Sequence, residues 1–466
     1  MSHRVAVINV VGLTRRLIGA ETPRLEALVQ RRGLATVTPA FPAVTCTAQS
    51  NYLTGALPSQ HGIVSNGWYN RDLAETHFWK QSNAMVHAPK IWDELRSAVP
   101  DFTCATLFWW YNMYSGADFT ISPRPMYPAD GRKVFDIYTQ PASVRHEIKR
   151  DLGEFPFATF WGPVAGVNSP QGPPQAASSW IAKAARWVEE KFHPTLNLIY
   201  LPHLDYSLQR LGPAHPGLSP DLRAVDALVG ELLDFFAQRG VEVMLLSEYG
   251  ITAVDRPVHL NRLFREQGWL AIRPELGLEL LDCGASRVFA VADHQVAHIY
   301  LKDRSLEAAV RKLVANQPGV AAVLGASEKR ACGLDHERAG DLIAVAQENA
   351  WFTYYYWMDD ALAPDFARTV DIHRKPGYDP VELFLDPKLQ WPKLHIARRL
   401  LQKKLGFRML MDVIPLDATL VKGSHGVRPV SELDWPVLIP TEPHLLPESK
   451  IESTAVYEAI KKAVLG

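Results

Sequence analysis

The sequence contains few cysteines and no long hydrophobic run, and each absence argues against a class of protein. Its four cysteines lie far apart and form no C-x-x-C pair, which predicts reduced thiols in place of a disulfide framework. No apolar run approaches the roughly eighteen residues that a membrane-spanning helix needs. The N-terminal stretch MSHRVAVINVVGLTRR has a short apolar part and no small-residue cleavage site, so it predicts a first strand and not a signal peptide. We therefore expect a cytoplasmic protein without a membrane partner.

An excess of charge of either sign is also missing. The chain has 49 basic and 50 acidic residues, so nothing in the overall charge suggests a surface for a nucleic-acid polymer. Attraction for an anionic substrate would have to be local.

The length of the chain bears on its domain organisation. With 466 residues the chain exceeds one simple core, which predicts a large domain with an inserted lobe, or two domains.

The hydrophobic pattern predicts an α/β fold. The continuous apolar run at residues 4–12 is typical of a buried parallel strand, and a helix from Thr22 to Gly33 follows it. Amphipathic helix patterns followed by apolar strands return at residues 180–201 and 222–246. Since both of these strands end in polar residues, and parallel sheets place their sites at the carboxyl ends of strands, we expect a site there.

Residues 100–175 are rich in aromatic residues, proline and glycine, and they show little periodicity. This composition predicts long loops over the sheet. Trp109, Trp110 and Tyr111 are more often a packed wall than a base-stacking surface, and both interpretations stay open at this point.

Residues 41–66 carry the most information about function. Phe41-Pro42 forms a turn before Thr45, and a short helix ending near Gly55 follows. A hydroxyl at this junction sits where helix amides point outward and the helix dipole favours negative charge, so Thr45 is well placed to carry a phosphoryl group. Cys46 is a second candidate nucleophile, because a thiol at a helix N-terminus has a lowered pKa, but no His/Asp constellation accompanies it.

The same stretch resembles the nucleophile segment of the nucleotide pyrophosphatase/phosphodiesterase branch of the alkaline phosphatase superfamily. The matching features, in order, are Phe41, Pro42, Thr45, Thr54-Gly55, Pro58, His61-Gly62-Ile63 and Asn66. The resemblance implies an alkaline-phosphatase-like core, a mostly parallel sheet flanked by helices. It also implies that Thr45 is the nucleophile and that Asn66 helps to hold a phosphate oxygen. Taken singly, each residue could be only a helix cap or a turn residue.

In that family two metal ions, usually zinc, flank the nucleophile, and the resemblance implies where their ligands fall here. In the D-x-x-x-H segment Asp205 is kept and Gln209 replaces the histidine. Glu248 and Tyr249 replace the adjacent Asp-His pair, and the late histidine is kept as His425. The predicted ligands are therefore Asp205, Gln209, Glu248 and His425.

One further ligand position, after the first strand, is occupied by Val11, which cannot bind a metal, and Asn9 is only a weak neutral substitute. Because this altered set of predicted ligands offers mostly oxygen donors and one imidazole, it favours Mn²⁺ or Mg²⁺ over Zn²⁺, or one divalent ion in place of two. Arg210 is a candidate clamp for phosphate, because a guanidinium binds two oxygens in a fixed fork, or else a structural ion pair.

Residues 271–345 resemble the small α+β lobe that the superfamily inserts late in the chain, including an R-x-G-D at Arg338–Asp341. We predict a catalytic core of residues 1–270 and 346–466 with this lobe inserted as a cap. Three other polar clusters are dense in the sequence. His203 lies two residues before Asp205, and an extended backbone would point both side chains to the same side. The other two clusters are Asp293, His294 and His298, and Asp371, His373 and Asp379 with Arg374 and Lys375. Each of these residues could equally be a hydrogen-bonded side chain near a loop.

These features predict a metal-dependent phosphohydrolase of the phosphodiesterase/nucleotide pyrophosphatase type, acting on a small phosphorylated metabolite or nucleotide through Thr45. The alternatives are a catalytically altered or inactive family member that binds a metabolite or serves a pathway, and a changed reaction such as group transfer. The substitutions at Val11, Gln209 and Tyr249 favour the alternatives. The retained Thr45 and His425 favour the enzyme.

Overall fold

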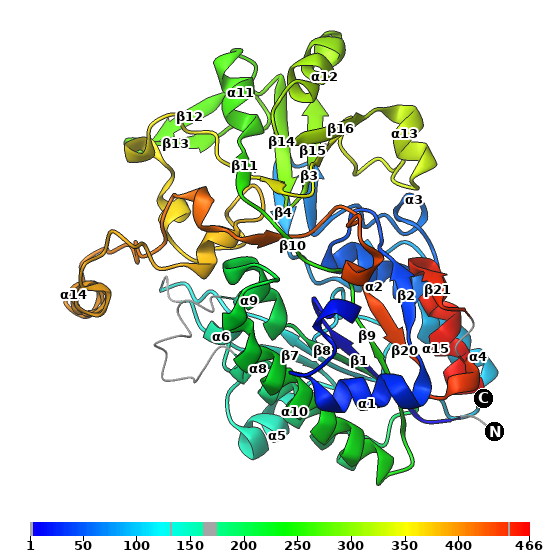
Figure 1. Cartoon of the computed structure of the whole chain (residues 1–466). Coiled ribbons are helices and arrows are strands. Elements are labelled where there is room, and N and C mark those ends of the chain that lie inside the picture. Colours follow the sequence, from blue (N-terminus) through cyan, green and yellow to red (C-terminus); the bar gives the residue numbers. More distant parts are fainter. Residues whose placement is uncertain (1–2, 131–132, 162–174, 446–447) are drawn as a thin grey trace.

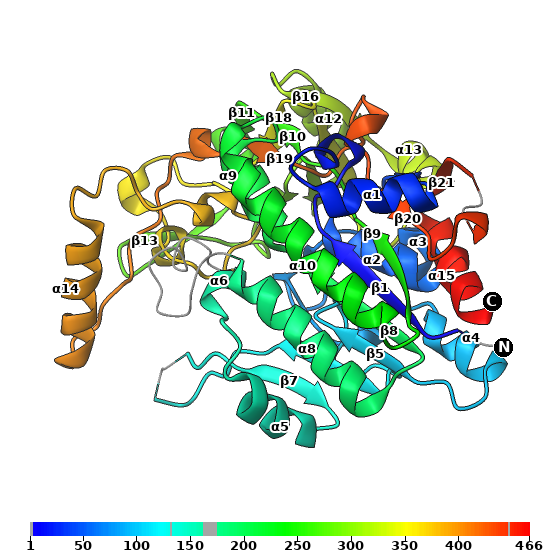
Figure 2. The same cartoon turned by 60° about the horizontal axis from the view of Figure 1, so that its bottom comes forward.

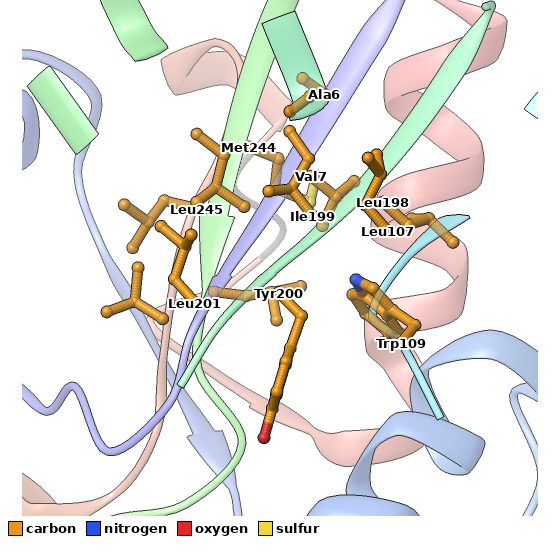
Figure 3. Close-up of a cluster of buried hydrophobic side chains, with 14 of the residues drawn as sticks. Ala6, Val7, Leu107, Trp109, Leu198, Ile199, Tyr200, Leu201, Met244 and Leu245 are labelled. Carbon is orange, nitrogen blue, oxygen red and sulfur yellow. The ribbon is translucent and has the colours of Figure 1, made fainter. Parts of the chain in front are cut away.

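The computed structural model describes residues 3–130, 133–161, 175–445 and 448–466, and it consists of a large α/β layer structure with a second sheet above it (Figure 1). The central strands of the large sheet are β1 (Val5–Val10), β8 (Leu196–Leu201) and β9 (Glu242–Leu246). β1 pairs in parallel with both of the others, so the three predicted strands lie side by side. Val7, Leu198 and Met244 occupy neighbouring positions across these strands and pack in the main core (Figure 3).

The large sheet has nine strands and is mostly parallel, as predicted. β20 runs antiparallel to both of its neighbours and β7 runs antiparallel to β6, whereas the other paired strands are parallel. The order across the sheet is β21 (Lys450–Glu452), β2 (Ala35–Thr38), β20 (Val437–Ile439), β9, β1, β8, β5 (Cys104–Leu107), β6 (Phe119–Pro123) and β7 (Ile137–Gln140).

Helices cover both faces of this sheet (Figure 2). One layer holds α1, α8 and α10, and the opposite layer holds α2, α4 and α15. The helices predicted from apolar spacing form because that spacing gives each of them one buried stripe. Their bounds are α1 (Pro23–Arg32), α8 (Ala176–Phe192), α10 (Ser219–Ala237), α2 (Thr45–Thr54), α4 (Ile91–Ala98) and α15 (Val456–Leu465).

The expectation of long loops at residues 100–175 is wrong for part of that segment. It supplies β5, β6 and β7 of the large sheet and helix α5 (Ser143–Leu152), while residues 162–174 lie outside the described residues. The strands are only four or five residues long, which is too short for a clear periodic pattern. Trp109 and Tyr111 are buried, as expected of a packed wall.

The second sheet is four-stranded and antiparallel, in the order β14 (Val288–Asp293), β15 (Val296–Leu301), β17 (Leu342–Ala346) and β16 (Val320–Leu324). The hydrophobic core around it also takes in residues outside 271–345, among them Val64, Phe264 and Trp351. The division into a core and an inserted lobe stays a prediction.

Shorter elements complete the described chain. They are α3 (Pro58–His61), β3 (Gly67–Asn70), β4 (Glu75–Phe78), α6 (Ala158–Trp161), α9 (His203–Leu211), β10 (Thr252–Ala253), β11 (Arg256–Val258), α11 (Leu260–Glu266), β12 (Ile272–Glu275), β13 (Leu278–Leu281), α12 (Glu307–Ala315), α13 (Ala326–Ala331), β18 (Ala350–Phe352), α14 (Pro392–Lys404) and β19 (Gly423–Ser424). Among the helices of the described ranges, none has the length and apolar character required to cross a bilayer. All four cysteines are unpaired, as predicted.

Candidate active site

Helix α2 begins at Thr45, which forms part of the wall of a pocket. Val44 before it is extended, and the helix ends at Gly55 in the left-handed conformation with φ of 65°, as its sequence predicts. The polar side chains of the pocket wall come from distant parts of the chain, and they are joined by several aromatic rings. The wall includes Thr45, Asn66, Asp205, Tyr249, His294, Lys375 and His425, with Trp79, Trp110, Tyr200 and Tyr378 among the rings.

Thr45 is hydrogen-bonded into a chain that leads to Asp205. The Thr45 hydroxyl lies 3.2 Å from the Tyr249 hydroxyl, which donates in turn to Asp205 Oδ1, also at 3.2 Å. When the single proton of Tyr249 is used for Asp205, the hydroxyl of Thr45 is the donor in the Thr45–Tyr249 bond, and Glu248 and Tyr200 also interact with this hydroxyl. Tyr249 therefore links the hydroxyl of Thr45 to a buried carboxylate through two hydrogen bonds.

Asp205 is buried in a polar setting. Gln209 donates its amide to Asp205 Oδ2 at 2.7 Å, and His425 Nε2 lies 3.8 Å from Asp205 Oδ1. Burial raises the pKa of Asp205 to about 6. His425 Nδ1 lies 2.7 Å from the carbonyl of Ala43, which can only accept, so this nitrogen carries the proton. Burial lowers the pKa of His425, and its Nε2 is left with a lone pair near Asp205.

Glu248 is buried and is held by two amides. Asn9 and Gln49 both donate to Glu248 Oε1 at 2.6 Å, and among the described residues Oε2 has no hydrogen-bond partner. Burial raises the pKa of Glu248 to about 8, so the neutral acid prevails at pH 7.

The predicted ligands do not fit the two-metal centre that the family resemblance implies. Asp205 and His425 lie together, but Gln209 contributes a neutral amide that is already bonded to Asp205, and Glu248 is bonded to Asn9 and Gln49. Within the described ranges, no group of three or more histidine, cysteine or acidic side chains could hold a metal ion. The substituted positions thus contribute hydrogen bonds where the family has metal ligands.

Asn66 and His294 are positioned by one buried carboxylate, Asp293. Asp293 Oδ2 accepts the backbone N–H of Asn66 at 2.8 Å and the hydroxyl of Ser65 at 2.6 Å, and Oδ1 accepts the Asn66 amide at 3.2 Å. Asp293 Oδ1 also lies 2.6 Å from His294 Nδ1. Burial raises the pKa of Asp293, but the hydrogen bonds from His294, Ser65 and Asn66 outweigh burial and hold the pKa below its usual value.

His294 brings an imidazole from the second sheet into the pocket. Its backbone adopts a φ of 59°, an uncommon conformation for a residue other than glycine. The ring lies between those of Tyr378 and His425, with centroid distances of 3.8 Å and 3.7 Å. Among the described residues its Nε2 has no hydrogen-bond partner. The sequence indicates Asp293 and His294 as part of a dense polar cluster, but only the fold shows that His294 lines the pocket that contains Thr45.

The remaining candidates divide between the pocket and the protein interior. Lys375 and Asp379 are on the pocket wall, but Arg210 is not, and it is only half-buried. His203 begins helix α9, so the extended backbone expected to align it with Asp205 is absent and that expectation is wrong. His298 is buried and its Nδ1 accepts the backbone N–H of Gly340 at 3.0 Å, within the R-x-G-D segment. Asp371, His373 and Arg374 are not part of the pocket wall, and Arg374 pairs with Asp365 at 2.9 Å.

Cys46 is a poor nucleophile in this structure. Its side chain is fully buried and does not line the pocket. Burial raises the pKa of its thiol well above the usual range, which is opposite to the effect expected from the helix N-terminus. Desolvation therefore dominates the helix dipole here, and the expectation of a lowered pKa is wrong.

Lys375 is committed to two buried carboxylates and is not available as a simple phosphate ligand. Its ammonium lies 2.7 Å from Asp379 and 2.5 Å from Glu382, and all three side chains are buried.

We expect Lys375→Met to lower the free energy of unfolding by about 3–5 kcal/mol, because it leaves two buried acidic groups without their cation. Urea unfolding measures this change, and Lys312→Met, on exposed α12, is the control. A loss below about 1 kcal/mol would contradict the assignment.

Residues 5–379 of this chain match the model of a protein family that is described as type I phosphodiesterase / nucleotide pyrophosphatase. An uncharacterised pyrophosphatase/phosphodiesterase of Schizosaccharomyces pombe is 23% identical over 255 residues. That match covers 52% of this chain and 44% of the yeast protein, so the likeness spans less than half of the length of that relative.

Two solved structures share the fold over nearly the whole chain. Murine ectonucleotide pyrophosphatase/phosphodiesterase 5, as an inactive threonine-to-alanine variant in complex with AMP, is 13% identical with a TM-score of 0.56, covering 99% of this chain and 95% of its own. Phosphonoacetate hydrolase from Sinorhizobium meliloti, in complex with phosphonoacetate, is 16% identical with a TM-score of 0.60, covering 99% and 96%. These likenesses confirm the fold class that the sequence predicts.

Proposed function

Since this chain belongs to the type I phosphodiesterase/nucleotide pyrophosphatase family, we propose that it is a phosphohydrolase that cleaves a small phosphorylated metabolite or nucleotide through Thr45. The observation that carries the proposal is the hydrogen-bonded chain from Thr45 through Tyr249 to Asp205. It gives the hydroxyl both a place at a helix N-terminus and an acceptor for its proton. The threonine-to-alanine change in the inactive murine relative supports the same role for a threonine.

The first step of the proposed reaction forms a bond between Thr45 Oγ1 and phosphorus and breaks the bond to the leaving group. The Thr45 proton moves to the Tyr249 oxygen while the Tyr249 proton moves to Asp205 Oδ1, so the phenol stays neutral. The leaving oxygen takes its proton from solvent. Water then attacks phosphorus and releases one proton to solvent, and Thr45 recovers its proton from Asp205 along the same path.

Negative charge on the phosphate would be met by three groups at the pocket wall. The N-terminus of α2 favours an anion, and Asn66 stands beside it with its carbonyl oxygen accepting the N–H of Cys46 at 3.0 Å. His294 is oriented by Asp293 and has a ring nitrogen that is available to donate when the imidazole is protonated. These groups would supply part of the electrostatic stabilisation that metal ions give in the family.

The divalent metal remains a prediction from the resemblance, and no step above depends on it. Asp205 and His425 are the two strong donors that lie together, whether for Zn²⁺ or for the harder Mn²⁺ or Mg²⁺. We expect elemental analysis of the purified protein, after dialysis against each ion, to find no more than one ion per chain. Two tightly bound ions per chain would show that other side chains rearrange into a dinuclear centre, contrary to this account.

A second candidate function is a phosphate-ester-binding protein without turnover. It is favoured by the bond between Asn66 and the Cys46 amide, because an amide that would otherwise face a phosphate oxygen is already occupied. Incubation with AMP and with a 4-nitrophenyl phosphodiester separates the two. A hydrolase releases nitrophenolate, whereas a binding protein shows a raised melting temperature with AMP and no product.

A further inference from the structure

A projecting arm, residues 387–412, leaves the body of the protein and returns to it at one point. The backbone N–H of Asp386 donates to the carbonyl of Val413 at 2.8 Å and closes the stem of this arm. Helix α14 lies within it, and both views of the molecule show the helix standing apart from the two sheets (Figures 1 and 2). No residue of α14 is buried. Ile396 is half-buried and packs against the core of the second sheet, whereas the exposed leucines of this helix are not explained by packing in the core.

The apolar stripe of α14 points away from the protein. Leu394, Leu401 and Leu405 are 67%, 56% and 64% exposed, and with Ala397 they recur every three or four residues along one helix face. The opposite face holds the half-buried residues Pro392, His395, Ile396, Arg399 and Gln402. This arrangement is the reverse of a surface helix in a globular protein, which turns its apolar stripe inward.

Polar contacts on the inner face hold α14 in this orientation. Asp412, where the arm returns, lies 2.8 Å from His395 Nε2 and 2.5 Å from Arg399 Nη2. Burial raises the pKa of Asp412, but the hydrogen bonds from Arg399 and His395 outweigh burial and hold the pKa below its usual value. Because the inner face is tied to the stem through Asp412, the leucines are held outward.

Aromatic residues and positive charge complete the arm. Trp391 precedes the helix and Phe407 follows it, and they are 73% and 66% exposed. Between residues 387 and 411 there are seven lysines and arginines and no acidic residue, whereas the whole chain has a net charge of −1, so the remainder carries −8. The basic residues are Lys388, Lys393, Arg398, Arg399, Lys403, Lys404 and Arg408.

We propose that the arm binds the surface of a phospholipid bilayer that contains anionic lipids. An exposed apolar stripe flanked by lysine and arginine, with aromatic residues at both ends, is the pattern of a helix that lies in the interface of a membrane. The charge favours this occupant over a second copy of the chain, because residues 387–412 carry seven basic residues and one acidic residue, so two arms would each bring a net charge of +6. The proposal replaces the expectation from the sequence that the protein has no membrane partner.

The arm follows part of the pocket wall closely in the sequence. Glu382 and Leu383 are part of the pocket wall, and the arm begins a few residues later. The inference about membrane binding does not depend on the proposed hydrolysis, since it rests only on the arm.

Co-sedimentation of the full chain with vesicles tests the proposal. We expect the protein to pellet with phosphatidylcholine vesicles that contain phosphatidylserine, and to bind at least about tenfold less to pure phosphatidylcholine or in high salt. The variant L394E/L401E/L405E should lose binding by at least about tenfold. Leu276→Glu replaces a leucine that is 92% exposed on the turn between β12 and β13, and this control should bind like the wild type.

The other outcomes overturn the proposal. These are equal pelleting of the triple variant and the wild type, or no pelleting with phosphatidylserine. A dimer that the triple variant abolishes, without vesicle binding, would assign the arm to a second copy, and binding only to an acidic protein would assign it to a protein partner. The melting temperature and the rate with a water-soluble nitrophenyl phosphodiester should be unchanged in the triple variant. These two readouts separate failure of this inference from failure of the proposed function.

Discussion

Thr45→Ala is expected to reduce hydrolysis of a 4-nitrophenyl phosphodiester by roughly 10³-fold or more, because the covalent step then has no nucleophile. The melting temperature should change little, since Thr45 at the pocket wall makes its side-chain hydrogen bond to Tyr249 and the smaller side chain leaves α2 in place. Steady-state release of nitrophenolate, together with thermal unfolding, measures both quantities.

Two variants on the same helix control this experiment. Thr45→Ser keeps a hydroxyl at the same position and should retain a substantial part of the rate. Thr47→Ala removes a buried hydroxyl that donates to the carbonyl of Ile63 at 3.3 Å, away from the pocket wall, and should stay active. If Thr45→Ala hydrolyses the substrate as fast as Thr47→Ala does, Thr45 is not the nucleophile.

Tyr249→Phe is expected to lower kcat by about 10²- to 10³-fold, because it removes the link that carries the proton from Thr45 to Asp205. Phenylalanine keeps the ring that stacks on His425 at a centroid distance of 3.6 Å, so His425 should keep its position. The measurement is kcat for the nitrophenyl phosphodiester, with KM followed separately to detect changes in substrate binding.

The matched control is Tyr52→Phe, which removes another buried phenol from the same region. Tyr52 donates to the carbonyl of Ser247 at 2.8 Å, two residues before Tyr249, and it is not part of the pocket wall. We expect its loss to lower stability by about 1 kcal/mol and to leave kcat near the wild-type value. Equal effects of the two substitutions on kcat would show that Tyr249 has only a structural role.

The sequence predicted the central fold and the helix that begins at Thr45 because both depend on local patterns. Continuous apolar runs specify β1 and β8, and the turn before Thr45 with Gly55 after it specifies α2. The family resemblance of residues 41–66 extends to the whole fold, as the solved relatives confirm. Short strands such as β5 were missed, because four residues give no reliable period.

The chemistry of the pocket could be predicted only in part, because it depends on side chains that meet through the tertiary fold. Tyr249 was recognised as a lost metal ligand, but its bonds to Thr45 and Asp205 require the positions of three separate segments. His294 follows strand β14 of the second sheet, and nothing in its local sequence indicates that it reaches the pocket wall. Nothing in the local sequence indicates that Glu382 shares Lys375 with Asp379.

The most direct test of the account is to look for the covalent intermediate on Thr45. The protein is mixed with a nitrophenyl phosphodiester, quenched in acid during turnover, digested and examined by mass spectrometry. The account predicts a peptide that contains residue 45 and carries the phosphoryl ester of the substrate on that side chain, and no such peptide from Thr45→Ala. Product formation with no adduct on Thr45, or with the adduct on Cys46, would contradict it.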